Sequence, residues 1–570
     1  MKIYDNSNLA ESYSGVTTPL TFSFAQYVYQ EVYKNFCQMM GVGKKDIKAN
    51  ADMFPNMVVF ICGRMYYDLN NWYRLVSLLP GYSFNKVFFE KMLGVEKSSD
   101  YKSEREASML AKIFIYLPRL AWQILKISFS LIFMRNLVAS FNSYFDHVYN
   151  EVKKKDLKET SESELKNLYQ SITGDLVARW RVPIANDLAV MISTGVIHKL
   201  FEKWLPETNS YEYLYVSSQA PLISLDPGSE VLKIVEEIQE DDNTRTLFCT
   251  EQDPGKILTI LRTKYSQSDI LADINSYIEK YGDRMPGELK LESKTVRESP
   301  ESLINILVSA TKSKNKSFNH TTSQVELEKI ELPFFKRQLV SRVLSWAKSS
   351  IVLREETRFK RTLVFGLARN VFTQLGHIYQ RNGFLKKADD VFLLTADELL
   401  TDNINIKKKF TTLVTQRKES YAKFSKIQMP RRIESDETLN SIEKHFVTQS
   451  IPAGAKAKRR VLSFQGRVAS TGGLQEMTGE VLIVREFDSS LDYNNKIVVT
   501  THTDPGWSMV FPFIKAIIVE RGGTLSHAAI IARELKIPCI IGIESAIDLI
   551  KNTDTIRMNL ADGSVEITNG

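Results

Sequence analysis

Cysteine is scarce in this chain of 570 residues, and its four cysteines are widely separated. None forms a Cys-x-x-C pair, and none belongs to a local cluster of cysteine and histidine. The sequence therefore predicts neither a disulfide framework nor a structural metal site. The four residues are Cys37, Cys62, Cys249 and Cys539.

Long uncharged apolar runs are also missing. The most apolar region, 113–141, is interrupted by Arg119, Lys126 and Arg135, so no uncharged stretch reaches the ~18 residues of a membrane span. We expect an amphipathic helix there that faces the core, with binding to a membrane surface or to a partner as the alternative. The first residues lack the pattern of a secretory signal. We therefore expect a cytoplasmic protein without a transmembrane segment.

A nucleotide-binding loop is the third absence. The segment Gly41-Val-Gly-Lys-Lys45 lacks the first glycine and the hydroxyl residue of a Walker motif. The net charge is only +7, a mild excess that suits anionic substrates such as phosphates and does not indicate nucleic acid. The length and the 43% of hydrophobic residues predict a globular protein of about three domains.

Residues 1–447 are predicted to form a large, mainly α-helical domain. Apolar residues recur at helical spacing over long segments in which glycine and proline are sparse. These segments are 22–40, 103–153, 188–204 and 333–382.

The pattern changes after residues 448–460, where small residues, one proline and several basic residues predict a hinge linker. Residues 461–570 then predict a small α/β domain. Its expected strands are 461–468, 479–484, 496–500 and 516–520, and its expected helices are 526–535 and 545–551.

His527 is the most informative residue of this second domain. It follows Gly522, Gly523, Thr524 and Ser526 and precedes a run of helix-forming apolar residues. We predict a strand, a tight loop and a helix, with His527 in the first helical turn. Free backbone N–H groups and the positive end of a helix stabilise an anion there. Because histidine can carry a phosphoryl group covalently, we predict that His527 is a phosphohistidine. The alternative is a helix cap or a satisfied polar residue.

Several separated motifs support the phosphohistidine. They are Thr503-Asp-Pro-Gly-Trp507, Gly522-Gly-Thr-Leu-Ser-His-Ala-Ala529, Ala532-Arg533 and Ile537-Pro-Cys-Ile-Ile-Gly542. This string resembles the swivelling phosphohistidine domain of the phosphoenolpyruvate-utilising enzymes. That family includes phosphoenolpyruvate synthase, pyruvate phosphate dikinase and rifampicin phosphotransferase. The resemblance implies that His527 is the catalytic phosphohistidine and that the four small residues before it bind phosphate.

The helical part carries two further segments that resemble the same family. Residues 7–23 resemble the segment that follows the ATP-grasp domain, where Glu11 matches a polar residue of the substrate site; a helix-capping role is the alternative. Residues 281–288 resemble a stretch in which a basic residue and a glutamate recur. There Arg284 would bind phosphate or the acceptor, and Glu288 would be a general base. An Arg–Glu pair that stabilises a turn is the alternative for that segment.

Three arginines are predicted to form a basic stripe on one helix. Arg354, Arg358 and Arg361 are spaced at i, i+4 and i+7, which places them on one face. Guanidinium groups bind phosphoryl oxygens and stabilise the charge of phosphoryl transfer. The resemblance implies catalytic roles for Arg354 and Arg358, although relatives carry lysine at the second position. That difference puts a proton-transfer role in doubt. A salt-bridged surface involving Glu355 or Glu356 is the alternative.

These observations predict one subunit of a split, ATP-dependent phosphotransferase, similar in arrangement to phenylphosphate synthase. In this prediction an ATP-grasp partner holds ATP and Mg²⁺ and phosphorylates His527, and this chain itself holds no metal. The phosphoryl group then passes to a small-molecule acceptor in the helical domain. The alternative is a phosphocarrier that relays phosphate to a protein partner.

Overall fold

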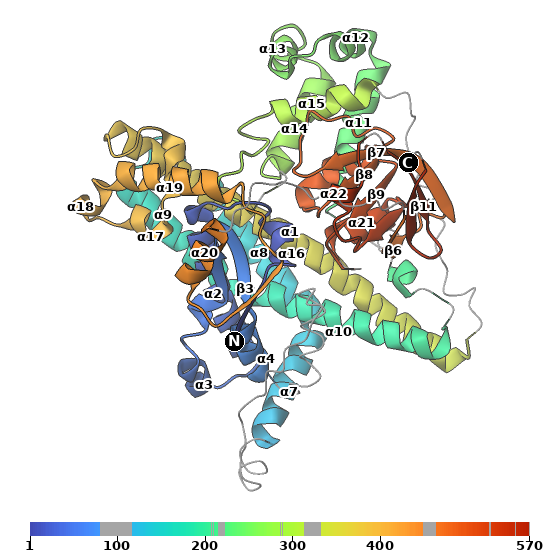
Figure 1. Ribbon diagram of the computed structural model, residues 1–570, viewed down its shortest axis with the longest axis horizontal. Helices are drawn as coiled ribbons and strands as arrows, with labels where there is room; N and C mark the ends of the chain where they lie inside the picture. Colours follow the sequence, from blue (N-terminus) through green and yellow to red (C-terminus); the bar gives the residue numbers. More distant parts are fainter. Residues whose placement is uncertain are drawn as a thin grey trace. The chain divides into compact units, whose positions relative to one another are not determined.

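The computed structural model describes residues 1–79, 117–206, 208, 210–214, 223–284, 287, 289–312, 332–448, 463–523, 526–552 and 554–568. Figure 1 shows the helices and strands of the chain, coloured along its sequence. The chain divides into two compact units. The first comprises residues 1–192, 289–292 and 360–454. The second comprises 193–288, 293–359 and 455–570.

The first unit is mainly helical, and the mainly helical region predicted over 1–447 continues through residues 193–288 and 293–359 of the second unit. Its helices are α1 (Leu9–Ser12), α2 (Pro19–Met39), α3 (Lys44–Ala49), η1 (Phe54–Asn56), α4 (Leu69–Ser77), α7 (Leu117–Ile132), α8 (Met134–Lys153), α9 (Glu162–Asp175), η3 (Val177–Arg179), η6 (Ala388–Leu393), α17 (Ala396–Leu400), α18 (Ile404–Lys407), α19 (Phe410–Phe424) and α20 (Leu439–Thr448). Helices α10 (Arg181–Trp204) and α16 (Phe334–Arg381) contribute residues to both units.

The first unit also contains a four-stranded sheet that the sequence did not predict. Its order is β2 (Val58–Ile61), β3 (Arg64–Asp68), β1 (Lys2–Asp5) and β4 (Arg432–Ser435), and the strands pair antiparallel. The alternation of apolar and polar residues is short in each strand. Strand β1 also pairs with β4, which comes from the other end of the unit. Such a pairing leaves no local periodic signal in the sequence.

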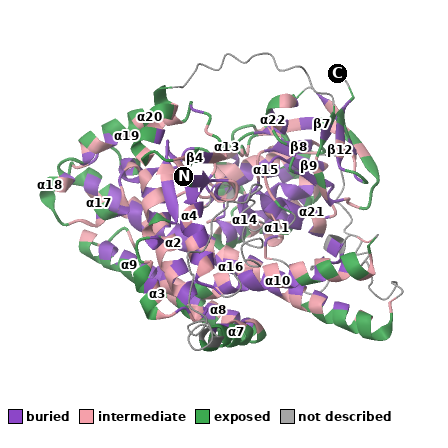
Figure 2. Ribbon diagram, turned by 60° about the horizontal axis from the view of Figure 1, so that its bottom comes forward, coloured by how far each residue is buried: buried purple, intermediate pink, exposed green. Residues whose placement is uncertain are grey.

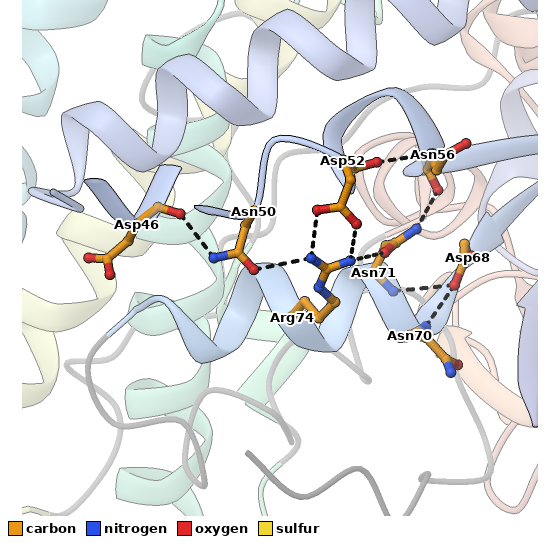
Figure 3. A network of polar contacts seen from close by, with 8 residues as sticks. All are labelled: Asp46, Asn50, Asp52, Asn56, Asp68, Asn70, Asn71 and Arg74. Atoms are coloured by element: carbon orange, nitrogen blue, oxygen red, sulfur yellow. Dashed lines mark hydrogen bonds and ion pairs between the residues drawn. The ribbon is translucent and has the colours of Figure 1, made fainter. Parts of the chain in front are cut away.

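A polar network fixes helix α4 beside this sheet (Figure 3). Asp68 caps the helix, because its carboxylate accepts hydrogen bonds from the backbone N–H groups of Asn70 and Asn71. Arg74, one turn later, donates to both carboxylate oxygens of Asp52 at 2.8 and 2.9 Å. This bidentate pair lowers the pKa of Asp52 and ties α4 to the segment before β2.

The second unit begins with helices and ends with a mixed sheet. Its helices are η4 (Ser210–Leu214), α11 (Asp226–Glu240), α12 (Asp242–Thr250), α13 (Pro254–Lys264), α14 (Asp269–Tyr281), α15 (Glu301–Lys312), η7 (Pro505–Met509), η8 (Phe511–Phe513), α21 (His527–Glu534) and α22 (Ala546–Leu549). Its strands are β5 (Ser463–Gln465), β6 (Arg467–Ser470), β7 (Glu476–Val484), β8 (Ile497–Thr500), β9 (Ala516–Val519), β10 (Cys539–Ile541), β11 (Thr555–Asn559) and β12 (Ser564–Ile567).

The eight strands lie in the order β5-β12-β11-β7-β8-β9-β10-β6. The central four, β7 to β10, run parallel, and antiparallel strands flank them on both sides. Three predicted strands and both predicted helices are present with boundaries shifted by a few residues. The strand predicted at 461–468 is instead divided into β5 and β6, which lie at opposite ends of the strand order. The short strands β10, β11 and β12 were not predicted.

Both faces of β8 and β9 are buried, which explains their continuous apolar sequence (Figure 2). On β9, Ile517 and Val519 face a core that includes α21 and apolar residues of α11, α13, α14 and α15. Ala516 and Ile518 face the opposite core, which α22 covers. Residues 469–541 and the helices between 231 and 310 therefore share one hydrophobic core within the second unit.

The predicted hinge 448–460 lies outside the described residues except for Thr448, the last residue of α20. Its role stays a prediction. One described stretch, Glu162–Trp204, is long and apolar enough to cross a membrane by length and composition, and half of its most apolar window is buried in the fold. The core helices of soluble proteins meet the same criterion, so this stretch is weak support for a membrane span.

Candidate phosphohistidine site

The site forms where two neighbouring parallel strands end. Strand β8 leads into the loop with Thr503 and Asp504, and β9 leads into the loop that ends at His527. Because β8 and β9 are adjacent and parallel, both loops leave the same edge of the sheet. Asp504 also accepts a hydrogen bond of 2.6 Å from the backbone N–H of Gly287, which fastens the segment after α14 to this edge.

His527 is the first residue of α21 and is only 3% exposed. Its Nδ1 lies 3.3 Å from the hydroxyl of Thr503, and its ring meets Phe511 edge to face at 5.9 Å. When Nδ1 donates to Thr503, Nε2 carries the lone pair. Nε2 is buried and has no hydrogen-bond partner among the described residues. Nε2, the nitrogen that can act as a nucleophile, is therefore the ring nitrogen without a hydrogen bond in the described parts of the chain.

The pKa of His527 lies well below its usual value. Burial is the main cause, because it disfavours the charged imidazolium, and the positive charges of Arg284 and Arg358 lower the pKa further. The imidazole is therefore neutral at physiological pH. A neutral imidazole is the form that can attack a phosphorus atom.

Arg284 is the second component of the site and is 1% exposed. Its guanidinium lies over the ring of Phe359, with Cζ 4.7 Å from the ring centroid. Its Nε and Nη1 are buried and lack hydrogen-bond partners within the described parts of the chain. Buried polar groups are usually satisfied, so these donors indicate a ligand that accepts hydrogen bonds.

Arg358 is the third component and lies on α16 one residue before Phe359. Its Nη1 is 3.8 Å from Oε1 of Glu355, which is beyond hydrogen-bond distance. The Glu355 carboxylate is 2% exposed, and its Oε1 also lacks a hydrogen-bond partner in the described structure. The charges of Arg284 and Arg358 both act on His527, so the environment of Nε2 is positive and suits an anion.

Three residues of the loop before His527 complete the site. Ser526 is the N-cap of α21 without making a side-chain cap, and its buried hydroxyl has no partner among the residues described. Gly522 has φ of +133°, a conformation that favours glycine. Gly523 has open space where a Cβ would lie. Together with the N–H groups at the start of α21, this loop can receive phosphoryl oxygens.

The structure brings together His527, Arg284 and Arg358 of the predicted residues. Arg354 lies one turn before Arg358 on α16, and Arg361 belongs to the first unit, where its charge acts on Tyr13 and Tyr29. Thr524 and Glu288 lie outside the described residues, and for Glu11 only its place in α1 is described. Among the residues that are described, no three histidine, cysteine or acidic side chains form a group suited to a metal ion.

Sequence reasoning assigned no role to Thr503, Asp504 and Phe359. Thr503 and Asp504 could have been found, because their motif directly follows a predicted strand next to the strand that leads to His527. Phe359 could not have been found, because its contact with Arg284 joins α16 to the end of α14.

Two family profiles match this chain. Residues 492–563 match the mobile domain of phosphoenolpyruvate-utilising enzymes, and residues 184–355 match the fourth domain of rifampicin phosphotransferase. The first match contains His527 and the second contains Arg284 and Arg354. Each match covers less than half of the chain, and together they confirm the resemblance to this family that is seen in the sequence.

Full-length relatives agree with these matches. Rifampicin phosphotransferase from Bacillus cereus is 25% identical over 67% of this chain, and the Bacillus subtilis protein is 24% identical over 72%. Phosphoenolpyruvate synthase from Neisseria meningitidis is 45% identical over 12% of this chain and 8% of its own length. The chain spans about half of the two rifampicin phosphotransferases, 44% and 49% of their lengths.

Proposed function

We propose that this chain is the phosphohistidine-bearing part of an ATP-dependent phosphotransferase. A single observation carries the proposal. The imidazole of His527 is buried and neutral, its Nε2 has no hydrogen-bond partner among the described residues, and the positive charges of Arg284 and Arg358 act on it. In the first half-reaction, Nε2 forms a bond to the phosphorus of the donor while the bond from that phosphorus to the donor's bridging oxygen breaks, and the remainder of the donor leaves with the bonding electrons. Arg284 and Arg358 stabilise the negative charge on the phosphoryl oxygens. In the second, a small-molecule acceptor takes the phosphoryl group from Nε2.

The phosphoryl donor in this proposal is ATP bound with Mg²⁺ to an ATP-grasp domain on a separate chain. The mobile domain carries His527 from that donor to the acceptor, with the hinge at 448–460. The acceptor is a small molecule with a hydroxyl or carboxylate group. Rifampicin is the first acceptor to try, because the full-length relatives are named for it.

The test is to incubate the purified chain with ATP labelled at the β-phosphate, with and without candidate ATP-grasp proteins. We expect acid-labile label on the chain only when a partner is present, and none on His527→Ala. Release of that label to a small molecule distinguishes the phosphotransferase from a phosphocarrier, which would release it only to a protein. Labelling of the chain without any partner would contradict the split arrangement. The absence of label with every partner would contradict the proposal itself.

A further inference from the structure

Glu355 lies on α16 three residues before Arg358, one of the two arginines whose charge acts on His527. Residues three and four apart are neighbours on a helix surface, so Glu355 adjoins both Arg358 and Phe359. Phe359 in turn supports the guanidinium of Arg284. The carboxylate therefore lies 3.8 Å from Arg358, one of the two cations that act on His527, and is a helix neighbour of the ring that supports the other.

The state of this carboxylate is unusual for a structural ion pair. It is 2% exposed, its contact with Arg358 is 3.8 Å, and its Oε1 has no hydrogen-bond partner among the described residues. A carboxylate that served only to neutralise Arg358 would be expected to accept its N–H groups at hydrogen-bond distance. Oε1 can therefore accept a hydrogen bond from a bound molecule.

The chemistry of that group follows from what a carboxylate can accept. A phosphoryl group offers only acceptor oxygens and negative charge, so Glu355 repels it. A neutral hydroxyl offers a proton and satisfies Oε1. The unpartnered atoms therefore divide into two sets, with Arg284 suited to the phosphoryl group and Glu355 suited to a hydroxyl.

We propose that Glu355 is the general base that takes the proton of an acceptor hydroxyl in the second half-reaction. This inference rests on the proposed function. The acceptor oxygen forms a bond to phosphorus while the bond from phosphorus to Nε2 breaks. The hydroxyl proton passes to Oε1 of Glu355, and the bonding electrons return to Nε2, which restores the neutral imidazole. A carboxylate acceptor has no proton to give and would be repelled.

The experiment uses the full chain and loads His527 directly with phosphoramidate, a small phosphoryl donor that requires no partner protein. Discharge, the loss of the phosphoryl group from His527 to an added acceptor, is then measured with two kinds of acceptor probe. Ethylene glycol and phenol must lose a proton when they attack, whereas pyridine attacks without a proton to lose. We expect Glu355→Gln to slow discharge to the hydroxyl probes by about 100-fold or more, the usual range for loss of a general base. Discharge to pyridine should stay within about twofold, since that attack needs no base.

The controls separate this role from its alternatives. Glu356→Gln, at the next position of α16, should leave both rates unchanged, and Glu288→Gln tests the base that the sequence predicted. An equal loss with both probes would show that Glu355 only positions Arg358, and a selective loss in Glu288→Gln alone would assign the base there; either result overturns the proposal. If Glu355→Gln does not fold, Glu355→Asp carries the test, with an expected selective loss of about tenfold for hydroxyl probes. Failure of the wild-type protein to load would instead contradict the proposed function.

Discussion

At the scale of the residue, Arg284 holds a positive charge in the interior without an ion pair among the described residues. Such a charge costs stability, and replacing it with an apolar side chain of similar length should remove that cost. We predict that Arg284→Met raises the free energy of unfolding by roughly 1–4 kcal/mol. It should also slow phosphoryl transfer by about 100-fold or more. Urea unfolding and the loading assay measure the two effects. A variant that is both less stable and fully active would contradict this role.

The lowered pKa of His527 predicts a pH-dependent stability. Below about pH 6.5 the unfolded chain binds a proton at this histidine, whereas the folded protein does not. The stabilising contribution is therefore complete above that pH and is lost as the pH falls toward the folded pKa, by up to about 1.4 kcal/mol per pH unit. Urea unfolding at pH 7.5 and 5.5 should show this loss in the wild type. The difference should shrink in His527→Gln, and an unchanged difference in that variant would refute the assignment.

At the scale of the element, the loop between β9 and α21 uses its two glycines differently. Gly522 has a positive φ that favours glycine, whereas a Cβ at Gly523 would meet open space. We predict that Gly522→Ala loses about 1 kcal/mol of stability and that Gly523→Ala loses less than about 0.5 kcal/mol. If the space at Gly523 is kept for phosphoryl oxygens, Gly523→Ala should still load His527 more slowly. Thermal unfolding and loading by phosphoramidate test the two statements separately.

The sequence predicted those elements whose signal is local. The long helix α16 and the central strands β8 and β9 carry unbroken periodic or apolar patterns, and His527 follows a recognisable strand and loop. The sheet formed by β1 and β4 was missed because its pairing joins distant segments. At the site, the sequence offered Glu355 only in the alternative reading, as one of two possible ion-pair partners of the arginines. Only the three-dimensional structure shows that its Oε1 is buried and lacks a hydrogen bond.

At the scale of the whole molecule, the proposed movement of the mobile domain must open contacts inside the second unit. Asn305 of α15 donates to the hydroxyl of Ser489 at 3.4 Å, beside the core that both regions share. We predict that joining these positions, as Asn305→Cys and Ser489→Cys with a short bifunctional thiol reagent, blocks phosphorylation by an ATP-grasp partner. Loading by phosphoramidate should continue, because the small donor needs no domain movement. The exposed Cys249 is first replaced with serine. Undiminished phosphorylation by the partner after cross-linking would show that α15 and the mobile domain need not separate.

The ring of Phe359 beneath Arg284 has a consequence for the speed of the reaction. An arginine that is paired with a carboxylate must exchange that carboxylate for the phosphoryl group whenever a ligand arrives. This exchange adds to the activation barrier of the reaction. A guanidinium that rests on an aromatic ring keeps its orientation while its N–H groups remain uncommitted. The phosphoryl group can therefore enter and leave without breaking an ion pair with Arg284. Such a receptor is suited to a group that stays only briefly.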